Sequence, residues 1–219
     1  MKILNPFKKY TLDDIPKQPI NVNQLRQTTR ILIVDDEPFN NEEALRALGF
    51  NLTIKKKWDN IQDAEPYHII VSDNRGVANA FNSTAEGAFV LSQIHINYPQ
   101  KGCIIYSHSA IDFSHTPLLQ GIKQMKKNDD TSEWEEIISE TICEIYDPKS
   151  IWFKVEKYLE NQNISRKILR NIEDCYVRAL LKDKGTTIEW NRQEWGLSSE
   201  AITLVSDFFK LATAAIGAL

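Results

Sequence analysis

The segment from Ile31 to Pro38 constrains the fold more than any other stretch, and it reads Ile-Leu-Ile-Val-Asp-Asp-Glu-Pro. Its first four residues are apolar and three of them are β-branched, a pattern typical of a short strand buried on both faces of a parallel sheet. The acids follow at the carboxyl end of that strand, where open α/β sheets bind their ligands. Asp35 and Asp36 repel each other unless a cation lies between them, so they are candidate Mg²⁺ ligands. A solvated turn without a metal is the alternative interpretation of these residues alone.

Other segments repeat the pattern of a buried strand that ends in a polar side chain. Tyr67–Asp73 ends in a carboxylate, and Gly102–Ser107 ends in a hydroxyl. A weaker strand candidate over 122–127 ends in two lysines. Because the carboxyl ends of parallel strands meet at one edge of a sheet, the sequence predicts an acid pair, a lone aspartate, a hydroxyl and an ammonium group at that edge.

The order and spacing of five residues, over about residues 30–145, resemble the receiver domain of two-component response regulators; they are Asp35, Asp36, Asp73, Ser107 and Lys126. The resemblance implies that Asp73 accepts a phosphoryl group from a histidine kinase or phosphotransfer protein. It implies a Mg²⁺ site formed by Asp36 and Asp73, with Asp35 acting mainly through water.

The resemblance also implies roles for the residues around this site. The backbone carbonyl of Arg75 would be a further metal ligand. Ser107 and Lys126 would contact the phosphoryl oxygens, and Gly87 would match the glycine that opens the third helix.

The fold that the resemblance implies is α/β, with a flavodoxin-like, parallel five-stranded receiver sheet over residues 30–146. Asn51–Lys55 is the remaining strand, because Leu52 and Ile54 alternate there with polar residues. Only about ten residues separate it from the next strand, so the second helix is expected to be shortened to one or two turns.

Several residues depart from the receiver pattern. His108 follows the hydroxyl residue where a small side chain is usual, and Lys127 stands where receivers have proline. Lys123 and Gln124 occupy the neighbourhood in which receivers carry an aromatic residue. His108, the missing aromatic residue and a long loop over 74–85 favour, as the alternative function, a phosphorylation-independent pseudo-receiver that acts as a scaffold or adaptor.

A phosphohydrolase is a third class, with Asp73 or Asp35 as its nucleophile. The aspartate phosphatases that it would resemble have an Asp-x-Asp spacing, which the adjacent Asp35 and Asp36 lack. We therefore expect no enzymatic activity beyond phosphorylation and dephosphorylation of the receiver itself.

The chain on either side of the receiver-like domain is predicted to differ in structure. Residues 1–29 form an N-terminal arm whose Tyr10, Leu12 and Ile15 are expected to pack on a neighbouring surface. Residues 147–219 form an α-helical extension, in which the only strand-like stretch is a possible Thr186–Trp190.

The last predicted helix carries Phe208 and Phe209, which point about 100° apart and widen its apolar arc. Such an arc must lie between layers of the same chain or be covered by another chain, and we expect a homodimer or a protein partner there. Asp207 and Lys210 argue against a membrane span in this helix.

Composition excludes other partners and indicates the compartment. The formal net charge is −4 and the charges are interleaved, so no nucleic-acid-binding surface is predicted. The three cysteines are scattered, as in a reducing cytoplasm, and the first residues lack the apolar core of a secretory signal. A cytoplasmic location is therefore expected.

Overall fold

The structure is a computed structural model that describes residues 4–16, 19–108, 113–181 and 195–217. The stretch Thr186–Trp190 lies outside the described residues. The chain divides into two compact units, which we call the sheet unit (Val22–Ile145) and the helical unit (Met1–Asn21 with Tyr146–Leu219).

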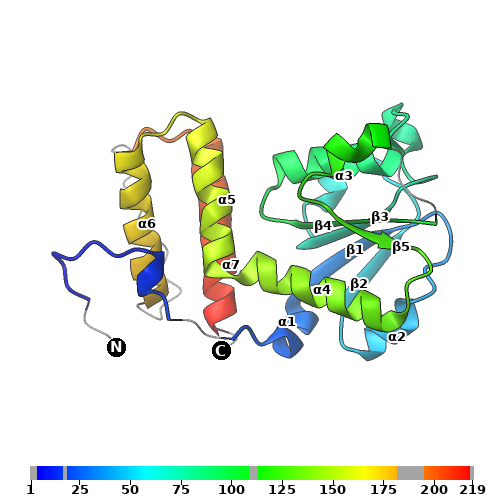
Figure 1. The fold of residues 1–219 in the computed structure, drawn as a ribbon, viewed down its shortest axis with the longest axis horizontal. Coiled ribbons are helices and arrows are strands. Elements are labelled where there is room, and N and C mark those ends of the chain that lie inside the picture. Colours follow the sequence, from blue (N-terminus) through cyan, green and yellow to red (C-terminus); the bar gives the residue numbers. More distant parts are fainter. Residues whose placement is uncertain (1–3, 17–18, 109–112, 182–194, 218–219) are drawn as a thin grey trace. The chain divides into compact units, whose positions relative to one another are not determined.

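The sheet unit is built on five parallel strands in the order β2-β1-β3-β4-β5 (Figure 1). This is the 2-1-3-4-5 order of the flavodoxin-like doubly wound fold, so the predicted fold class is confirmed. The strands are β1 (Arg30–Val34), β2 (Asn51–Lys55), β3 (Ile69–Asp73), β4 (Gly102–Ser107) and β5 (Lys123–Lys126).

The connections between these strands differ in length. Between β2 and β3 the described helical structure is a 3-10 turn, η2 (Ile61–Ala64), which agrees with the predicted shortening of the second helix. The remaining elements of the sheet unit are α1 (Val22–Thr28), α2 (Glu42–Ala47), η3 (Asn79–Phe81), α3 (Glu86–Asn97), η4 (Phe113–Leu119) and α4 (Thr131–Tyr146, whose last residue is assigned to the helical unit).

Helices α3 and α4 cover opposite faces of the sheet. Ile105 of β4 shares a buried apolar cluster with Leu91 and Ile94 of α3. The next residue, Tyr106, packs edge to face on Trp134 of α4, with ring centroids 5.2 Å apart. Because successive side chains of a strand point to opposite faces, the two contacts enclose the sheet from both sides.

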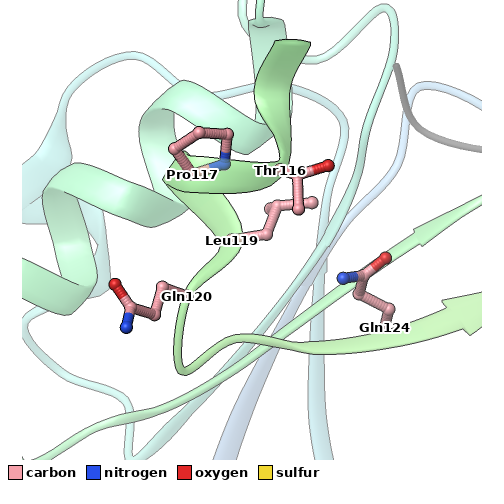
Figure 2. Close-up of a pocket in the computed structure, with 5 residues that line it drawn as sticks. All are labelled: Thr116, Pro117, Leu119, Gln120 and Gln124. Carbon is pink, nitrogen blue, oxygen red and sulfur yellow. The ribbon is translucent and has the colours of Figure 1, made fainter. Parts of the chain in front are cut away.

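A shallow, open pocket lies beside η4 and β5 (Figure 2). It is lined by Thr116, Pro117, Leu119, Gln120 and Gln124. None of these residues is among the site residues predicted from the sequence, so the candidate site lies elsewhere.

In the described residues of the helical unit, three long helices and the 3-10 turn η1 (Leu12–Asp14) pack around a separate apolar core. The helices are α5 (Pro148–Asn161), α6 (Arg166–Leu181) and α7 (Ser199–Gly217). Phe208 and Phe209 of α7 are both buried in this core. The part of the apolar arc that these two residues form is therefore covered by the same chain and does not need a second chain to cover it.

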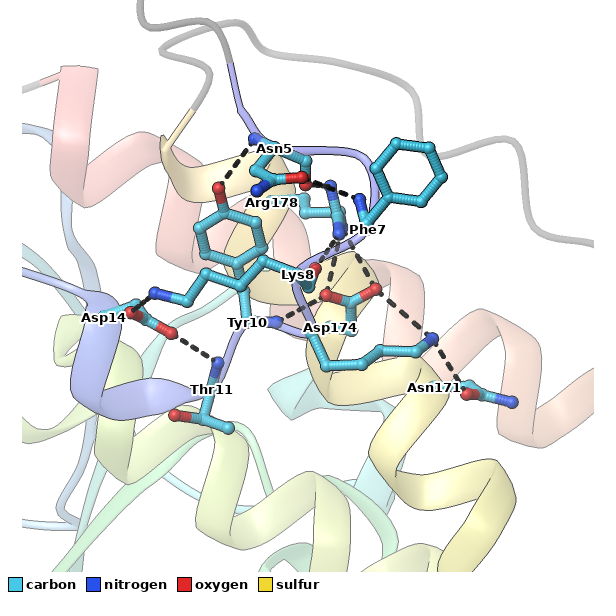
Figure 3. Close-up of polar contacts among 10 residues, drawn as sticks. Asn5, Phe7, Lys8, Tyr10, Thr11, Asp14, Asn171, Asp174 and Arg178 are labelled. Carbon is cyan, nitrogen blue, oxygen red and sulfur yellow. Dashed lines mark hydrogen bonds and ion pairs between the residues drawn. The ribbon is translucent and has the colours of Figure 1, made fainter.

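Within the helical unit, the N-terminal arm packs on the C-terminal helices (Figure 3). Tyr10 is buried in its core, while Leu12 and Ile15 pack against that core, as expected for an arm that meets a neighbouring surface. The structure groups residues 1–21 with the C-terminal helices, whereas α1, which the sequence placed in the arm, belongs to the sheet unit. The predicted boundaries at 29/30 and 146/147 thus differ from the division in the structure.

A buried acid on α6 anchors the arm. The Asp174 carboxylate accepts a hydrogen bond from the Tyr10 backbone N–H at 2.7 Å and from Arg178 Nε at 3.0 Å to each oxygen. Arg178 also donates to the backbone carbonyls of Asn5 and Lys8, and its guanidinium lies 4.7 Å from the centroid of the Tyr10 ring (Figure 3). Polar contacts therefore hold the arm on α6 in addition to its apolar packing.

Candidate functional site

The register of the sheet brings the predicted acids together. Val34 of β1 pairs with Ser72 of β3, so Asp35 and Asp73, one residue further along each strand, lie side by side. Carboxylate oxygens of Asp35, Asp36 and Asp73 all lie within 4.8 Å of one another. The three acids chosen from the sequence therefore form one cluster at the carboxyl edge of the sheet.

The three carboxylates have different surroundings. Asp35 and Asp73 are buried, whereas Asp36 is exposed. Asp35 accepts hydrogen bonds from the Glu37 backbone N–H at 2.9 Å and from the Tyr106 hydroxyl at 2.6 Å. Burial raises the pKa of the Asp73 carboxyl, although its hydrogen bond with a lysine ammonium group opposes that shift.

That lysine is Lys127. Its Nζ atom lies 2.9 Å from Asp73 Oδ2, 3.1 Å from Asp35 Oδ1 and 2.9 Å from Glu37 Oε2. Burial disfavours the charged form, but hydrogen bonds to the three acids outweigh that effect and raise the pKa of Lys127 above its usual value. The ammonium group therefore stays charged at neutral pH.

Lys126, the lysine chosen from the sequence, is exposed instead, and its backbone N–H donates to Asp129 Oδ2 at 2.8 Å. Lys127 therefore replaces Lys126 as the cation of this site. The cause is the pleat of β5, because moving one residue along a strand turns the side chain to the other face. Met125 and Lys127 are both partly buried, while Lys126 between them is not.

Two glycines allow the backbone to approach the acids closely. A Cβ atom on Gly76, which has a φ of +75°, would lie 2.3 Å from Asp36 Oδ2. A Cβ atom on Gly87 would lie 2.1 Å from the Asp73 carbonyl oxygen. Gly87 lies in the first turn of α3, the position expected from the sequence, so this helix can begin directly against the end of β3.

The other predicted site residues lie around the same edge. Ser107 is buried at the end of β4, and its carbonyl oxygen accepts the Lys127 backbone N–H at 3.0 Å. His108, the next residue, is exposed. Arg75 is exposed and its backbone N–H lies 3.4 Å from Asp73 Oδ1. The predicted role of its carbonyl in metal binding stays a prediction.

The sequence did not identify Tyr106 and Glu37 as members of the site. Burial, and secondly the hydrogen bond to Asp35, raises the pKa of the Tyr106 hydroxyl far above its usual value. The signal for Tyr106 lies in the register, which pairs it with Asp73, and a register is not visible in a single strand. Glu37 belongs to the acidic run after β1, but nothing in that run indicates that it shares the lysine with Asp35.

The donor set fits a magnesium ion. Carboxylate oxygens are the hard ligands that Mg²⁺ prefers, and Mg²⁺ keeps several of its waters when it binds. Asp36 is exposed and faces Gly76, where the absence of a Cβ atom leaves room for its carboxylate. The cluster therefore offers both ligands and access to water.

Comparison with solved structures finds similarity over about half of the chain. No protein-family model and no curated protein sequence matches the chain. Among solved structures, a CheY-like response regulator receiver domain protein from Methanospirillum hungatei JF-1 is 18% identical, with a TM-score of 0.42, over 51% of this chain and 91% of its own. A two-component transcriptional regulator, AraC, from Clostridium phytofermentans ISDg is 24% identical, with a TM-score of 0.41, over 53% of this chain and 95% of its own.

A response regulator receiver domain protein from Clostridium thermocellum is 16% identical, with a TM-score of 0.42, over 52% of this chain and 93% of its own. Over about half of its length the chain is similar to response regulator receiver domains, and the rest is a helical extension.

Proposed function

We propose that this protein is a response regulator whose Asp73 accepts a phosphoryl group from a histidine kinase or a phosphotransfer protein. One observation carries the proposal. The buried Asp73 carboxylate lies 2.9 Å from the Lys127 ammonium group and has oxygens within 4.8 Å of those of Asp35 and Asp36. A nucleophilic carboxylate, a fixed cation and a candidate metal site are the parts that phosphoryl transfer requires.

The transfer exchanges one bond to phosphorus for another. A carboxylate oxygen of Asp73 forms the new O–P bond while the N–P bond of the donor phosphohistidine breaks. The bonding electrons return to the imidazole nitrogen, which takes up a proton from the solvent. Asp73 needs no base, because the carboxylate is itself the nucleophile.

Lys127 and Ser107 would stabilise the product. The Lys127 ammonium already contacts Asp73 and would pair with the phosphoryl oxygens, the role that the sequence assigned to Lys126. The Ser107 hydroxyl, at the end of the neighbouring strand, would donate a hydrogen bond to the same group. Both contacts neutralise charge on the transferred group.

Magnesium would be held by Asp36, Asp73 and the Arg75 carbonyl, with Asp35 acting through water. When bound, it would supply positive charge that offsets the repulsion between the carboxylates and an incoming phosphoryl group. We propose that the protein has no enzymatic turnover beyond its own phosphorylation and dephosphorylation.

The helical unit would carry the output through protein contacts, as a homodimer or with a partner protein, in the cytoplasm and without nucleic acid. In the part of the chain that the structure describes, no helix has the length and apolar character that a membrane crossing requires. Phe208 and Phe209 are buried within the unit, so the contact surface would lie on other faces of these helices.

Intact-mass measurement after incubation with acetyl phosphate and Mg²⁺ tests the proposal. The wild-type protein should gain one phosphoryl group, and Asp73→Asn should gain none while remaining folded. The Asp36→Ala variant should need more Mg²⁺ for the same labelling. A wild-type protein without an adduct would point to the scaffold function, and continuous phosphate release from small phosphoesters would point to a hydrolase.

A further inference from the structure

Tyr106 connects the acid cluster to a buried group of aromatic rings. Its hydroxyl donates to Asp35 Oδ2 at 2.6 Å. Its ring packs edge to face on Trp134 of α4, at 5.2 Å between centroids, and on Phe39, at 6.1 Å. Trp134 and Phe39 also pack on each other, at 5.0 Å. The position of the hydroxyl is therefore set by three rings that hold one another in place.

Tyr106 and Lys127 both donate hydrogen bonds to Asp35, but they play different roles there. The Asp35 side chain is 0% exposed, so its charge depends on hydrogen bonds from the protein. Lys127 divides its ammonium group among three acids and would follow the phosphoryl group after transfer. The Tyr106 hydroxyl contacts Asp35 from a ring that aromatic packing holds in place.

The hydroxyl is the only part of Tyr106 that the aromatic packing does not require. A phenylalanine would make the same ring contacts, and a buried hydroxyl without a partner would be destabilising. Its orientation toward one oxygen of Asp35 fixes the rotation of the carboxylate. The other oxygen, Oδ1, faces Lys127 and the Glu37 backbone N–H.

We propose that Tyr106 is a positioning residue for the metal site, which holds Asp35 in the orientation that Mg²⁺ binding uses. The inference rests on the proposed function, because it concerns the same acid cluster. Partners that orient metal ligands from outside the coordination shell typically change metal affinity by about 10- to 100-fold when they are removed. Because Asp35 reaches the metal through water, the Tyr106→Phe variant should bind Mg²⁺ about 10-fold more weakly than wild type, at the lower end of this range.

Isothermal titration of the full chain with MgCl₂ tests this inference. The matched control is Tyr98→Phe, which removes a tyrosine hydroxyl bonded to another carboxylate of the sheet unit, Glu65 Oε1, at 3.0 Å. Wild type and Tyr98→Phe should bind Mg²⁺ equally, and Tyr106→Phe should bind it more weakly while its far-ultraviolet circular dichroism spectrum and thermal unfolding stay close to those of wild type. Equal affinity in all three proteins would overturn the role of Tyr106 and leave the metal site standing. A wild-type protein that binds no Mg²⁺ would overturn both.

A double-mutant cycle with Asp35→Ala, which removes the acceptor of the Tyr106 hydroxyl, separates positioning from a general loss of structure. If Tyr106 acts through Asp35, Tyr106→Phe should change the Mg²⁺ affinity of the Asp35→Ala protein less than twofold. The same fold-loss in both backgrounds would show that Tyr106 acts through the fold as a whole, and the inference would fail.

Discussion

Replacing each of two neighbouring lysines by alanine tests the geometry of the candidate site. The side chains of Asp35, Asp73 and Lys127 are 0%, 9% and 9% exposed. Removing one partner of a buried ion pair typically costs about 3–5 kcal/mol, because an uncompensated charge stays behind. Glu37 is 62% exposed, so its contact with Lys127 adds little. We expect Lys127→Ala to lower the stability of the sheet unit by about 3 kcal/mol.

Lys126→Ala is the matched control, since it replaces the adjacent lysine, at the end of β5, whose side chain is exposed. Surface substitutions of this kind change stability by about 0.5 kcal/mol or less. Hydrogen exchange of the β3 and β4 amides, measured by mass spectrometry, reports on the sheet unit separately from the helical unit. A loss of about 3 kcal/mol corresponds to exchange that is roughly a hundredfold faster in Lys127→Ala.

Magnesium should reverse part of this loss, because it replaces the positive charge that Lys127 supplied. Mg²⁺ should also bind more tightly to Lys127→Ala than to wild type, since no ammonium group competes for Asp35 and Asp73. Equal effects of the two lysine substitutions, or a larger effect at Lys126, would refute the placement of Lys127 in the acid cluster.

Three further predictions concern other parts of the chain. Asp174→Ala removes the acceptor of the Tyr10 N–H and should lower the local stability of the arm by about 3 kcal/mol, so that this amide exchanges its hydrogen roughly a hundredfold faster. Unchanged exchange would show that Asp174 does not anchor the arm. Burial lowers the pKa of His68 to about 4, so the free energy of unfolding should fall by about 2 kcal/mol, after allowing for partial exposure, as the pH drops from about 6.5 through 4. Denaturation of wild type and His68→Asn at a series of pH values measures this; the same pH dependence in both proteins would contradict it. Phe209→Glu should unfold the helical unit, because Phe209 is 4% exposed and packs on Tyr176, and circular dichroism should show the loss of helix. A folded variant whose mass in light scattering differs from that of wild type would instead show an interface at this position.

The fold and the three acids were predictable because each depends on local pattern. Short apolar runs ending in a carboxylate identify β1 and β3, and the parallel arrangement then brings Asp35, Asp36 and Asp73 to one edge. The short connection after β2 follows from the few residues available there.

The cation was assigned to the wrong lysine for a physical reason. β5 reads Lys-Gln-Met-Lys and lacks the apolar alternation that would show which side chains face the core. In the structure Lys123 forms ion pairs with Glu140 and Glu144 of α4, so its side chain is on the face of the sheet that α4 covers. Alternate residues share a face, and Lys127, four residues later, therefore lies on the same face. The register with β4 agrees, because it pairs Met125 with Tyr106 and so places Met125, and Lys127 two residues later, on the face of Tyr106.

Tyr106 and the docking of the arm depend on contacts between distant segments. The hydrogen bond of Tyr106 joins residues 71 positions apart, and that between Tyr10 and Asp174 spans 164 positions. The apolar pattern indicated that Tyr10 would be buried, but not which helix would receive it. A single sequence contains no comparable signal for such pairs.

Chemical mapping of the phosphorylated residue tests the central claim, that Asp73 is the phosphoacceptor, most directly. The protein is incubated with acetyl phosphate and Mg²⁺, treated with borohydride and digested for tandem mass spectrometry. Borohydride reduces an aspartyl phosphate to homoserine and leaves free carboxylates unchanged. Homoserine at position 73, absent without acetyl phosphate, is the predicted result. Reduction at Asp35 or Asp36 instead, or at no aspartate, would contradict it.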